Sequence, residues 1–158
     1  MALSLLPADS FDLEKYLGSW YQFAATHQSY QPSGSYNVQA NYERVGDRVR
    51  VVNMLSFHGK TKRVQGTLFS NSTNPRKFRI HLEKVILWWG VTADYVVKEV
   101  LTRNGEYQFA LVGNNDEDIF YLLSRTKVVG CEDQARLREV VEQAGYHWDR
   151  LEFTAQIC

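Results

Sequence analysis

The sequence of 158 residues predicts an all-β fold, an eight-stranded antiparallel up-and-down β-barrel with one C-terminal α-helix. Three observations lead to this prediction. Apolar and polar residues alternate along most of the chain between Gly18 and Arg125, turn-forming residues interrupt the alternation at short intervals, and the apolar spacing becomes helical near the C-terminus. We expect one domain over residues 1–158, with a lead-in over 1–17, a barrel over 18–125, a helix over 132–144 and a final strand over 151–157.

The predicted strands share the two-residue alternation of a sheet that has one apolar face. In order, they cover residues 18–26, 38–42, 49–55, 64–68, 78–82, 94–102, 107–113 and 119–124. Gly46-Asp47 and Asn104-Gly105 mark tight hairpins between neighbouring strands, and Asn-Gly is the strongest short hairpin signal. Consecutive antiparallel strands favour closure into a barrel, because closure removes the exposed edges of the sheet.

The predicted helix near the C-terminus is amphipathic, and Gly145 is placed to end it. Its apolar residues recur at spacings of three and four: Ala135, Leu137, Val140, Val141 and Ala144. The short strand over residues 151–157 follows this helix.

Composition and charge limit the classes of partner. Eighteen Lys and Arg residues balance eighteen Asp and Glu residues, so the field that attracts proteins to nucleic acid is missing and we expect no nucleic-acid partner.

No apolar run reaches the ~18 residues that cross a bilayer, and the first ten residues lack the features of a signal peptide. We expect a mature secreted or periplasmic chain, with a cytoplasmic location left open, and a monomer or weak dimer.

Two segments at opposite ends of the predicted barrel carry a family resemblance. Residues 11–21, with Gly18 and Trp20 in a Gly-x-Trp motif, resemble the first-strand signature of the lipocalin family, and residues 119–126, with Arg125, resemble its last strand. Residues 37–42 and 107–112 are similar to the second and seventh strands of apolipoprotein D and of the bacterial lipoprotein lipocalins. The resemblance covers nearly the whole chain in order.

The resemblance implies that Gly18, Trp20 and Arg125 close the narrow end of the barrel. In this family the indole plugs that end and the guanidinium lies across it, a cation–π contact worth ~1 to 2 kcal/mol when it is shielded from water. The alternative is that Trp20 is an ordinary core residue and that Arg125 is a surface charge at a strand end.

The resemblance also implies a small hydrophobic ligand inside the barrel, such as a fatty acid, lysophospholipid, sterol, retinoid or pigment. Alternation along the strands places Gln22 and Ala24 inside together with Trp20. The ligand-binding residues that we expect are Ala40, Tyr42, Val51, Asn53, Phe78, Ile80, Tyr121 and Leu123. Tyr42, Asn53 and Tyr121 would orient the ligand through their polar atoms; the alternative is that these side chains fill a solid barrel and bond one another.

Trp88 and Trp89, which follow Ile86 and Leu87, fall on the connection between the fifth and sixth predicted strands, at the rim of the barrel mouth. Exposing four adjacent large apolar residues is costly. They either form a lid or contact a membrane surface or protein partner, or they fold back into the barrel.

No catalytic residue, metal site or cofactor is expected. The four histidines lie far apart, and the sequence has no phosphate-binding loop or nucleophile elbow. Neither Cys131 nor Cys158 lies on a barrel strand, where a nucleophilic thiol would be needed. Two alternatives to a carrier remain: an isomerase-type lipid enzyme that uses Glu99 or Asp94, and an interaction module that uses the barrel mouth.

Two covalent modifications have candidate residues. Many lipocalins carry a Cys at the start of the second strand that bridges to the C-terminal tail, but this chain has Asn37 there, so Cys131 is the candidate partner of Cys158. Asn71-Ser72-Thr73 fits the N-glycosylation acceptor pattern and falls in a turn.

Overall fold

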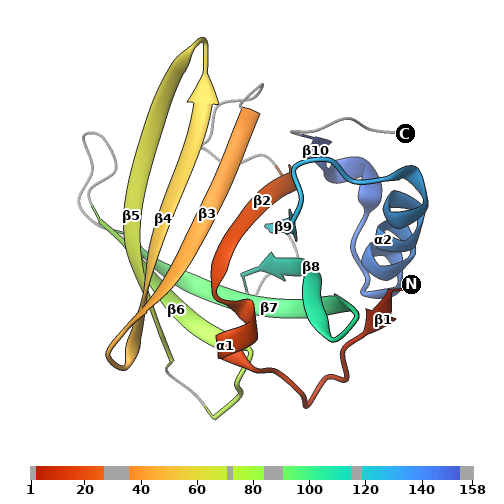
Figure 1. The fold of residues 1–158 in the computed structure, drawn as a ribbon, viewed down its shortest axis with the longest axis horizontal. Helices are drawn as coiled ribbons and strands as arrows, with labels where there is room; N and C mark the ends of the chain where they lie inside the picture. The colour runs from red at the N-terminus through yellow and green to blue at the C-terminus, as the bar shows by residue number, and fades with distance from the viewer. Residues whose placement is uncertain (1–2, 27–35, 71–72, 84–90, 115–118, 154–158) are drawn as a thin grey trace.

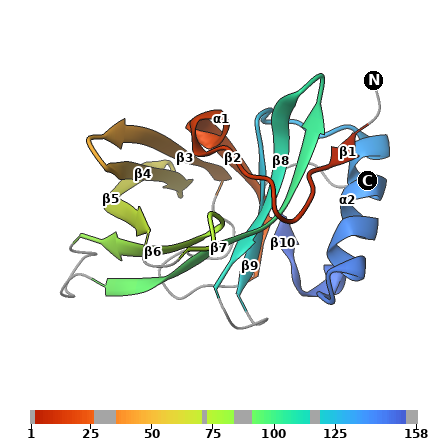
Figure 2. The same cartoon turned by 90° about the horizontal axis from the view of Figure 1, so that it is seen from below.

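The computed structural model describes residues 3–26, 36–70, 73–83, 91–114 and 119–153. Within them, eight antiparallel strands close into a barrel and one long helix packs against its outside (Figures 1 and 2), which confirms the predicted fold class. In the described part of the chain, no helix has the length and apolar character required to cross a membrane.

The barrel consists of consecutive strands, each paired with its neighbours in the sequence, and the pairing of the last with the first closes it. The strands are β2 (Gly18–Ala25), β3 (Tyr36–Val45), β4 (Arg48–Phe57), β5 (Lys60–Ser70), β6 (Lys77–Leu82), β7 (Val91–Arg103), β8 (Glu106–Gly113) and β9 (Phe120–Ser124). Two short strands extend the sheet: β1 (Ser4–Leu5) pairs with β7, and β10 (Glu152–Phe153) pairs with β2.

Three helical segments accompany the strands, namely α1 (Leu13–Tyr16), α2 (Cys131–Gln143) and the 3-10 turn η1 (Trp148–Arg150). The bounds of α2 agree with the predicted helix to within one residue at each end. The predicted final strand over residues 151–157 agrees at Glu152 and Phe153, but Leu151 caps the 3-10 turn instead of starting the strand. Residues 154–157 lie outside the described residues.

The strands bury both of their faces, but in two separate cores. Inward-facing residues such as Val51, Leu68 and Tyr95 form the barrel core. On the other face of β8 and β9, Phe109 and Leu122 pack against the apolar side of α2 in a second core. Figure 2 shows α2 along one side of the barrel, beside the strands that it covers. The helix therefore leaves the barrel interior free of its own side chains.

A β-bulge in β2 changes which side chains point inward. Gln22 pairs with Leu123, but Ala24, two residues later, pairs with Leu122, so one extra residue is inserted at Phe23. Leu123 belongs to the barrel core, whereas Phe23, Ala24 and Leu122 belong to the core under α2. The prediction that Ala24 lies inside was therefore wrong, because simple alternation does not continue through a bulge.

The hairpin between β7 and β8 has the turn that the sequence predicts. Arg103 pairs with Glu106, and the two residues between them have positive φ, +56° at Asn104 and +79° at Gly105. Positive φ at both central residues is the requirement of a type I′ turn, which suits the twist of antiparallel strands.

Replacing Gly105 with Ala should lower the free energy of unfolding by about 1 kcal/mol, because a side chain with a Cβ resists positive φ. Guanidinium denaturation measures the change. Gly105→Asn is the matched control, since Asn tolerates this conformation, and it should lose distinctly less. Equal losses in both variants would contradict the turn geometry described here.

Candidate functional site

One end of the barrel is closed by α1 and by the side chain of Trp20. The guanidinium carbon of Arg125 lies 3.8 Å from the centroid of the Trp20 ring. The indole also packs against the Tyr16 ring, with centroids 5.3 Å apart, and its Nε1 donates a hydrogen bond of 2.7 Å to the Tyr16 carbonyl oxygen. Trp20 and Tyr16 are both fully buried, so this end of the interior is closed to solvent.

Arg125 also bonds to four backbone carbonyl oxygens, which lie on α1 and its C-cap, on β2 and on β8. Its guanidinium donates to the carbonyl oxygens of Lys15 at 2.8 Å, Leu17 at 3.0 Å, Ser19 at 2.9 Å and Tyr107 at 3.2 Å. Burial lowers the pKa of Arg125, and the nearby Tyr16 and Glu106 oppose this effect. The group remains a cation at neutral pH, and its donors are engaged by carbonyl oxygens at the closed end.

Gly18 allows this close approach. Its φ is +100°, and a Cβ at this position would lie 3.4 Å from Arg125 Nη1. A larger residue would be strained in its backbone and would press against the guanidinium. The three residues expected to close the barrel thus lie together.

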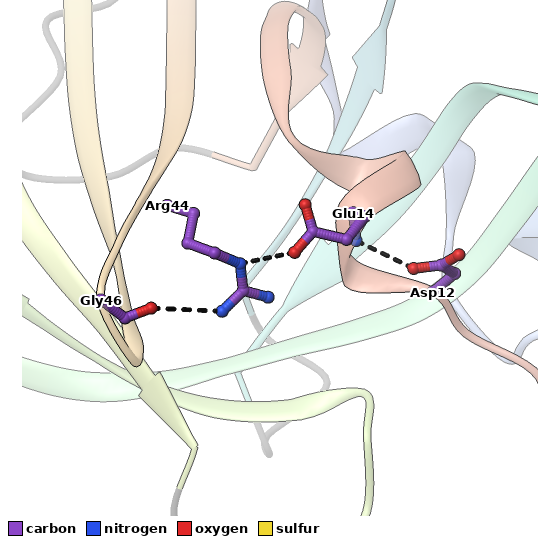
Figure 3. Close-up of polar contacts among 4 residues, drawn as sticks. All are labelled: Asp12, Glu14, Arg44 and Gly46. Carbon is purple, nitrogen blue, oxygen red and sulfur yellow. Dashed lines mark hydrogen bonds and ion pairs between the residues drawn. The ribbon is translucent and has the colours of Figure 1, made fainter.

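An ion pair fastens α1 to the barrel from outside (Figure 3). Arg44, at the end of β3, donates from Nε to Glu14 Oε1 at 2.5 Å and from Nη1 to the Gly46 carbonyl oxygen at 3.5 Å. Asp12 caps α1 by accepting a 3.0 Å hydrogen bond from the Glu14 amide. Because Glu14 and Arg44 are exposed, this pair contributes little stability, but it links α1 to the neighbouring β3–β4 hairpin.

Above the plug, three tyrosine hydroxyl groups form a buried hydrogen-bonded chain. The Tyr95 hydroxyl lies 2.5 Å from that of Tyr16 and 2.6 Å from that of Tyr42. Burial raises the pKa of Tyr16 and the pKa of Tyr95 well above the ordinary tyrosine value. Tyr121 lies beside this chain, with its ring centroid 6.5 Å from that of Tyr95.

Seven of the eight residues expected to bind a ligand belong to the barrel core or pack against it. Ala40, Tyr42, Val51, Phe78, Ile80 and Leu123 lie within this core, and Tyr121 packs on it. Asn53, the eighth, pairs with Ala40 and Val64, so it shares their inward face. The hydroxyl of Tyr42 bonds to that of Tyr95. This bond agrees with the alternative that the polar side chains inside the barrel bond one another.

Exposure of the inner wall increases from the plug toward the other end. Val51 and Leu68 are about 1% exposed and Tyr95 is 2% exposed. Farther from the plug, inward-facing residues are half-buried: Asn53, Leu55, Val64, Leu82, Ala93 and Tyr121. The barrel interior is therefore dry at one end and reached by solvent from the other.

Several predicted features fall outside the described residues. These are the rim residues Trp88 and Trp89 with their neighbours Ile86 and Leu87, the glycosylation candidate Asn71, and Cys158. Cys131, at the start of α2, is disulfide-bonded.

The two carboxylates considered for an isomerase lie outside the barrel. Asp94 forms a 2.6 Å ion pair with Arg79 on the outer face of β6 and β7. Glu99 pairs with Leu111, which belongs to the second core under α2. Partial burial of Glu99 raises the pKa of its carboxyl group. Neither carboxylate faces the interior. The described residues contain no group of His, Cys, Asp or Glu arranged to hold a metal ion.

Sequence reasoning missed two members of the site, Tyr16 and Tyr95. Tyr16 lies on a four-residue helix, too short to show periodicity. Tyr95 could have been found, because alternation from Ala93 to Val97 places it on the inward face of β7.

Comparisons with known proteins agree with this geometry. A family model described as "Lipocalin-like domain" matches residues 11–156. Temperature-induced lipocalin-1 of Arabidopsis thaliana is 27% identical over 152 residues, covering 92% of this chain and 79% of that protein. The outer membrane lipoprotein Blc of Vibrio cholerae is 27% identical over 159 residues, covering 99% and 89%. The crystal structure of lobster apocrustacyanin A1 superposes with a TM-score of 0.66 at 18% identity, covering 92% and 79%.

Removing the guanidinium at the plug should be strongly destabilising. Arg125→Met should lower the free energy of unfolding by about 3 kcal/mol, through loss of the cation–π contact and of charge-assisted hydrogen bonds. The matched control is Lys127→Met, which removes the same charge at an exposed position nearby and should change stability by about 0.5 kcal/mol or less. Similar losses in the two variants would show that Arg125 acts only as a surface charge.

The tyrosine chain predicts a loss of stability in alkali. Because the pKa of Tyr16 is raised in the folded state, the folded protein keeps this proton above pH ~10, where the unfolded chain releases it. Each such tyrosine should lower the free energy of unfolding by about 1.4 kcal/mol per pH unit between the unfolded and folded values. Urea denaturation from pH 9 to 11 should therefore show a shallower decline in Tyr16→Phe than in the wild type; parallel declines would contradict the assignment.

Proposed function

Because the chain belongs to the lipocalin family, whose members bind small hydrophobic ligands or pigments, we propose that this protein binds and carries such a ligand inside its barrel. The observation that carries the proposal is the gradient along the inner wall, from the fully buried plug at Trp20 to half-buried apolar residues such as Leu55 and Leu82. A ligand that enters from the exposed end would cover these side chains and stop at the plug.

The driving force for binding would be apolar burial. At roughly 25 cal/mol per Å², each ~200 Å² of apolar ligand surface removed from water contributes about 5 kcal/mol. Asn53 and Tyr121 are the polar side chains that best suit an orienting role, since both are half-buried on the inner side. Tyr42 would contribute its ring to the floor of the site, because its hydroxyl is hydrogen-bonded to Tyr95.

We propose binding without a chemical step, because Asp94 and Glu99 both lie on the outer surface of the barrel. The disulfide at Cys131 favours an oxidising compartment, which supports a secreted or periplasmic location.

Filling the inner wall tests the proposal. Ala93 faces inward on β7, whereas its neighbour Thr92 is exposed on the outer face. Ala93→Phe should weaken the binding of dodecanol, measured by isothermal titration calorimetry, by at least about ten-fold, or ~1.4 kcal/mol. Thr92→Phe, the matched control, should leave the affinity within about two-fold. Equal affinities in the two variants at matched thermal stability would contradict an interior site.

A further inference from the structure

A groove of about 380 Å³ lies on the outer face of the barrel, across β3, β4 and β5. Val52 and Met54 of β4 lie in the middle of it, and both are half-buried. They alternate with the inward-facing Val51, so they project away from the barrel interior. Figures 1 and 2 show α2 across the barrel from β4 and β5, so this helix does not cover the groove. The groove is therefore separate from the interior site.

The groove belongs to a strongly basic part of a chain that is neutral as a whole. Residues 48–82 contain eight of the eighteen Lys and Arg residues and none of the eighteen Asp and Glu residues. Two of these cations, Arg50 and Arg63, line the groove and are exposed. Within the described ranges, neither forms an ion pair with a carboxylate. Both guanidinium groups thus offer charged donors to an anionic partner.

The spacing of the two arginines matches the repeat of an extended chain. Arg63 pairs with Met54, which follows Arg50 by four residues on β4. At ~3.4 Å per residue, the two arginines are separated by ~14 Å along the strand direction, with Val52 between them. In an extended peptide, side chains four positions apart share one face at the same ~14 Å, and the side chain midway lies on that face too. Two carboxylates and one apolar side chain of such a peptide would therefore meet matching groups.

The polar walls of the groove suit the main chain of an extended peptide. The sheet backbone itself is unavailable, because β3, β4 and β5 are each hydrogen-bonded to a strand on both sides. Three side-chain amides line the groove instead, those of Gln39, Asn41 and Gln65. Each such amide carries both donors and an acceptor, so it can bond either the N–H or the C=O of a peptide.

One carboxylate in the groove disfavours a continuous polyanion. Glu43 pairs with Arg50 across β3 and β4, and it also lines the groove. A row of phosphates, as on nucleic acid or an anionic membrane, would place negative charge beside this carboxylate, where like charges repel. A peptide can place a neutral residue there and keep its carboxylates at the two arginines. The charge pattern therefore favours separate carboxylates.

We propose that this outer groove binds an extended acidic segment of a partner protein, in which two Asp or Glu residues lie four positions apart with an apolar residue midway. Arg50 and Arg63 bind the two carboxylates, and Val52 and Met54 contact the apolar side chain. Guanidinium–carboxylate bonds are charge-assisted and often bidentate, so they are stronger than bonds between neutral groups. Because the groove lies outside the barrel, this binding is independent of a ligand in the interior.

The probe is the peptide acetyl-Thr-Glu-Thr-Leu-Thr-Glu-Thr-amide. Three related peptides replace both Glu residues with Gln, replace both with Lys, or move the second Glu one position closer to the first. Binding to the nitrogen-15-labelled full-length protein is measured from chemical-shift changes of its amides. The test variant is Arg50→Gln/Arg63→Gln, and the matched control is Arg138→Gln, at an exposed position of α2. Thermal unfolding checks that the variants keep the stability of the wild type.

The wild type should bind the Glu peptide at least about ten-fold more tightly than the Gln peptide, and about five-fold more tightly than the peptide with altered spacing. The double variant should lose about ten-fold in affinity for the Glu peptide, and Arg138→Gln should stay within about two-fold. Charge reversal in Arg50→Glu/Arg63→Glu should make the Lys peptide the tighter ligand. Equal binding of the Glu and Gln peptides, or a Glu-peptide affinity that the double variant leaves unchanged, overturns the proposal.

Two further probes separate the peptide from a polyanion. These are vesicles of equimolar phosphatidylcholine and phosphatidylserine, and a short oligothymidylate. If either binds through Arg50 and Arg63 while the Glu peptide does not, the peptide proposal is wrong. The double variant should bind dodecanol as the wild type does, so failure of the groove and failure of the interior site are distinguishable.

Discussion

The stacking of the Arg125 guanidinium on the Trp20 ring is the interaction on which the rest of the structure depends. It joins the last barrel strand to the first, and the hydrogen bonds of the same guanidinium reach the backbone of α1 and β8. In the described part of the chain, this plug closes one end of the barrel. A ligand bound inside would therefore rest against the plug and meet solvent at the other end.

The two cores lie on opposite faces of the barrel strands, so packing against α2 and the proposed binding inside the barrel use different side chains. The core under α2, with residues such as Phe109 and Leu137, holds the fold together without using the barrel interior. The bulge at Phe23 contributes to this division, because it turns Phe23 and Ala24 toward α2 while Gln22 remains opposite Leu123. The inner wall away from the plug is partly exposed to solvent, since Leu55 and Ala93 are half-buried there.

Features set by local chemistry could be predicted from the sequence. The Asn104-Gly105 turn was predicted correctly because its conformation depends on two adjacent residues, and the strands followed from alternation. Features set by distant pairings could not. The bulge that moved Ala24 outward is a property of the β2–β9 register, and the Tyr42 hydroxyl meets that of Tyr95, 53 residues away.

The most direct test of this account is to locate a bound ligand by isotope-filtered nuclear Overhauser spectroscopy, with carbon-13-labelled dodecanoate and unlabelled protein. The account predicts contacts from the terminal methyl group to Val51 and Leu123, deep on the inner wall, and from the carbons next to the head group to Leu55. Contacts confined to the outward-facing Val52 and Met54, or none to the inner wall, would contradict it.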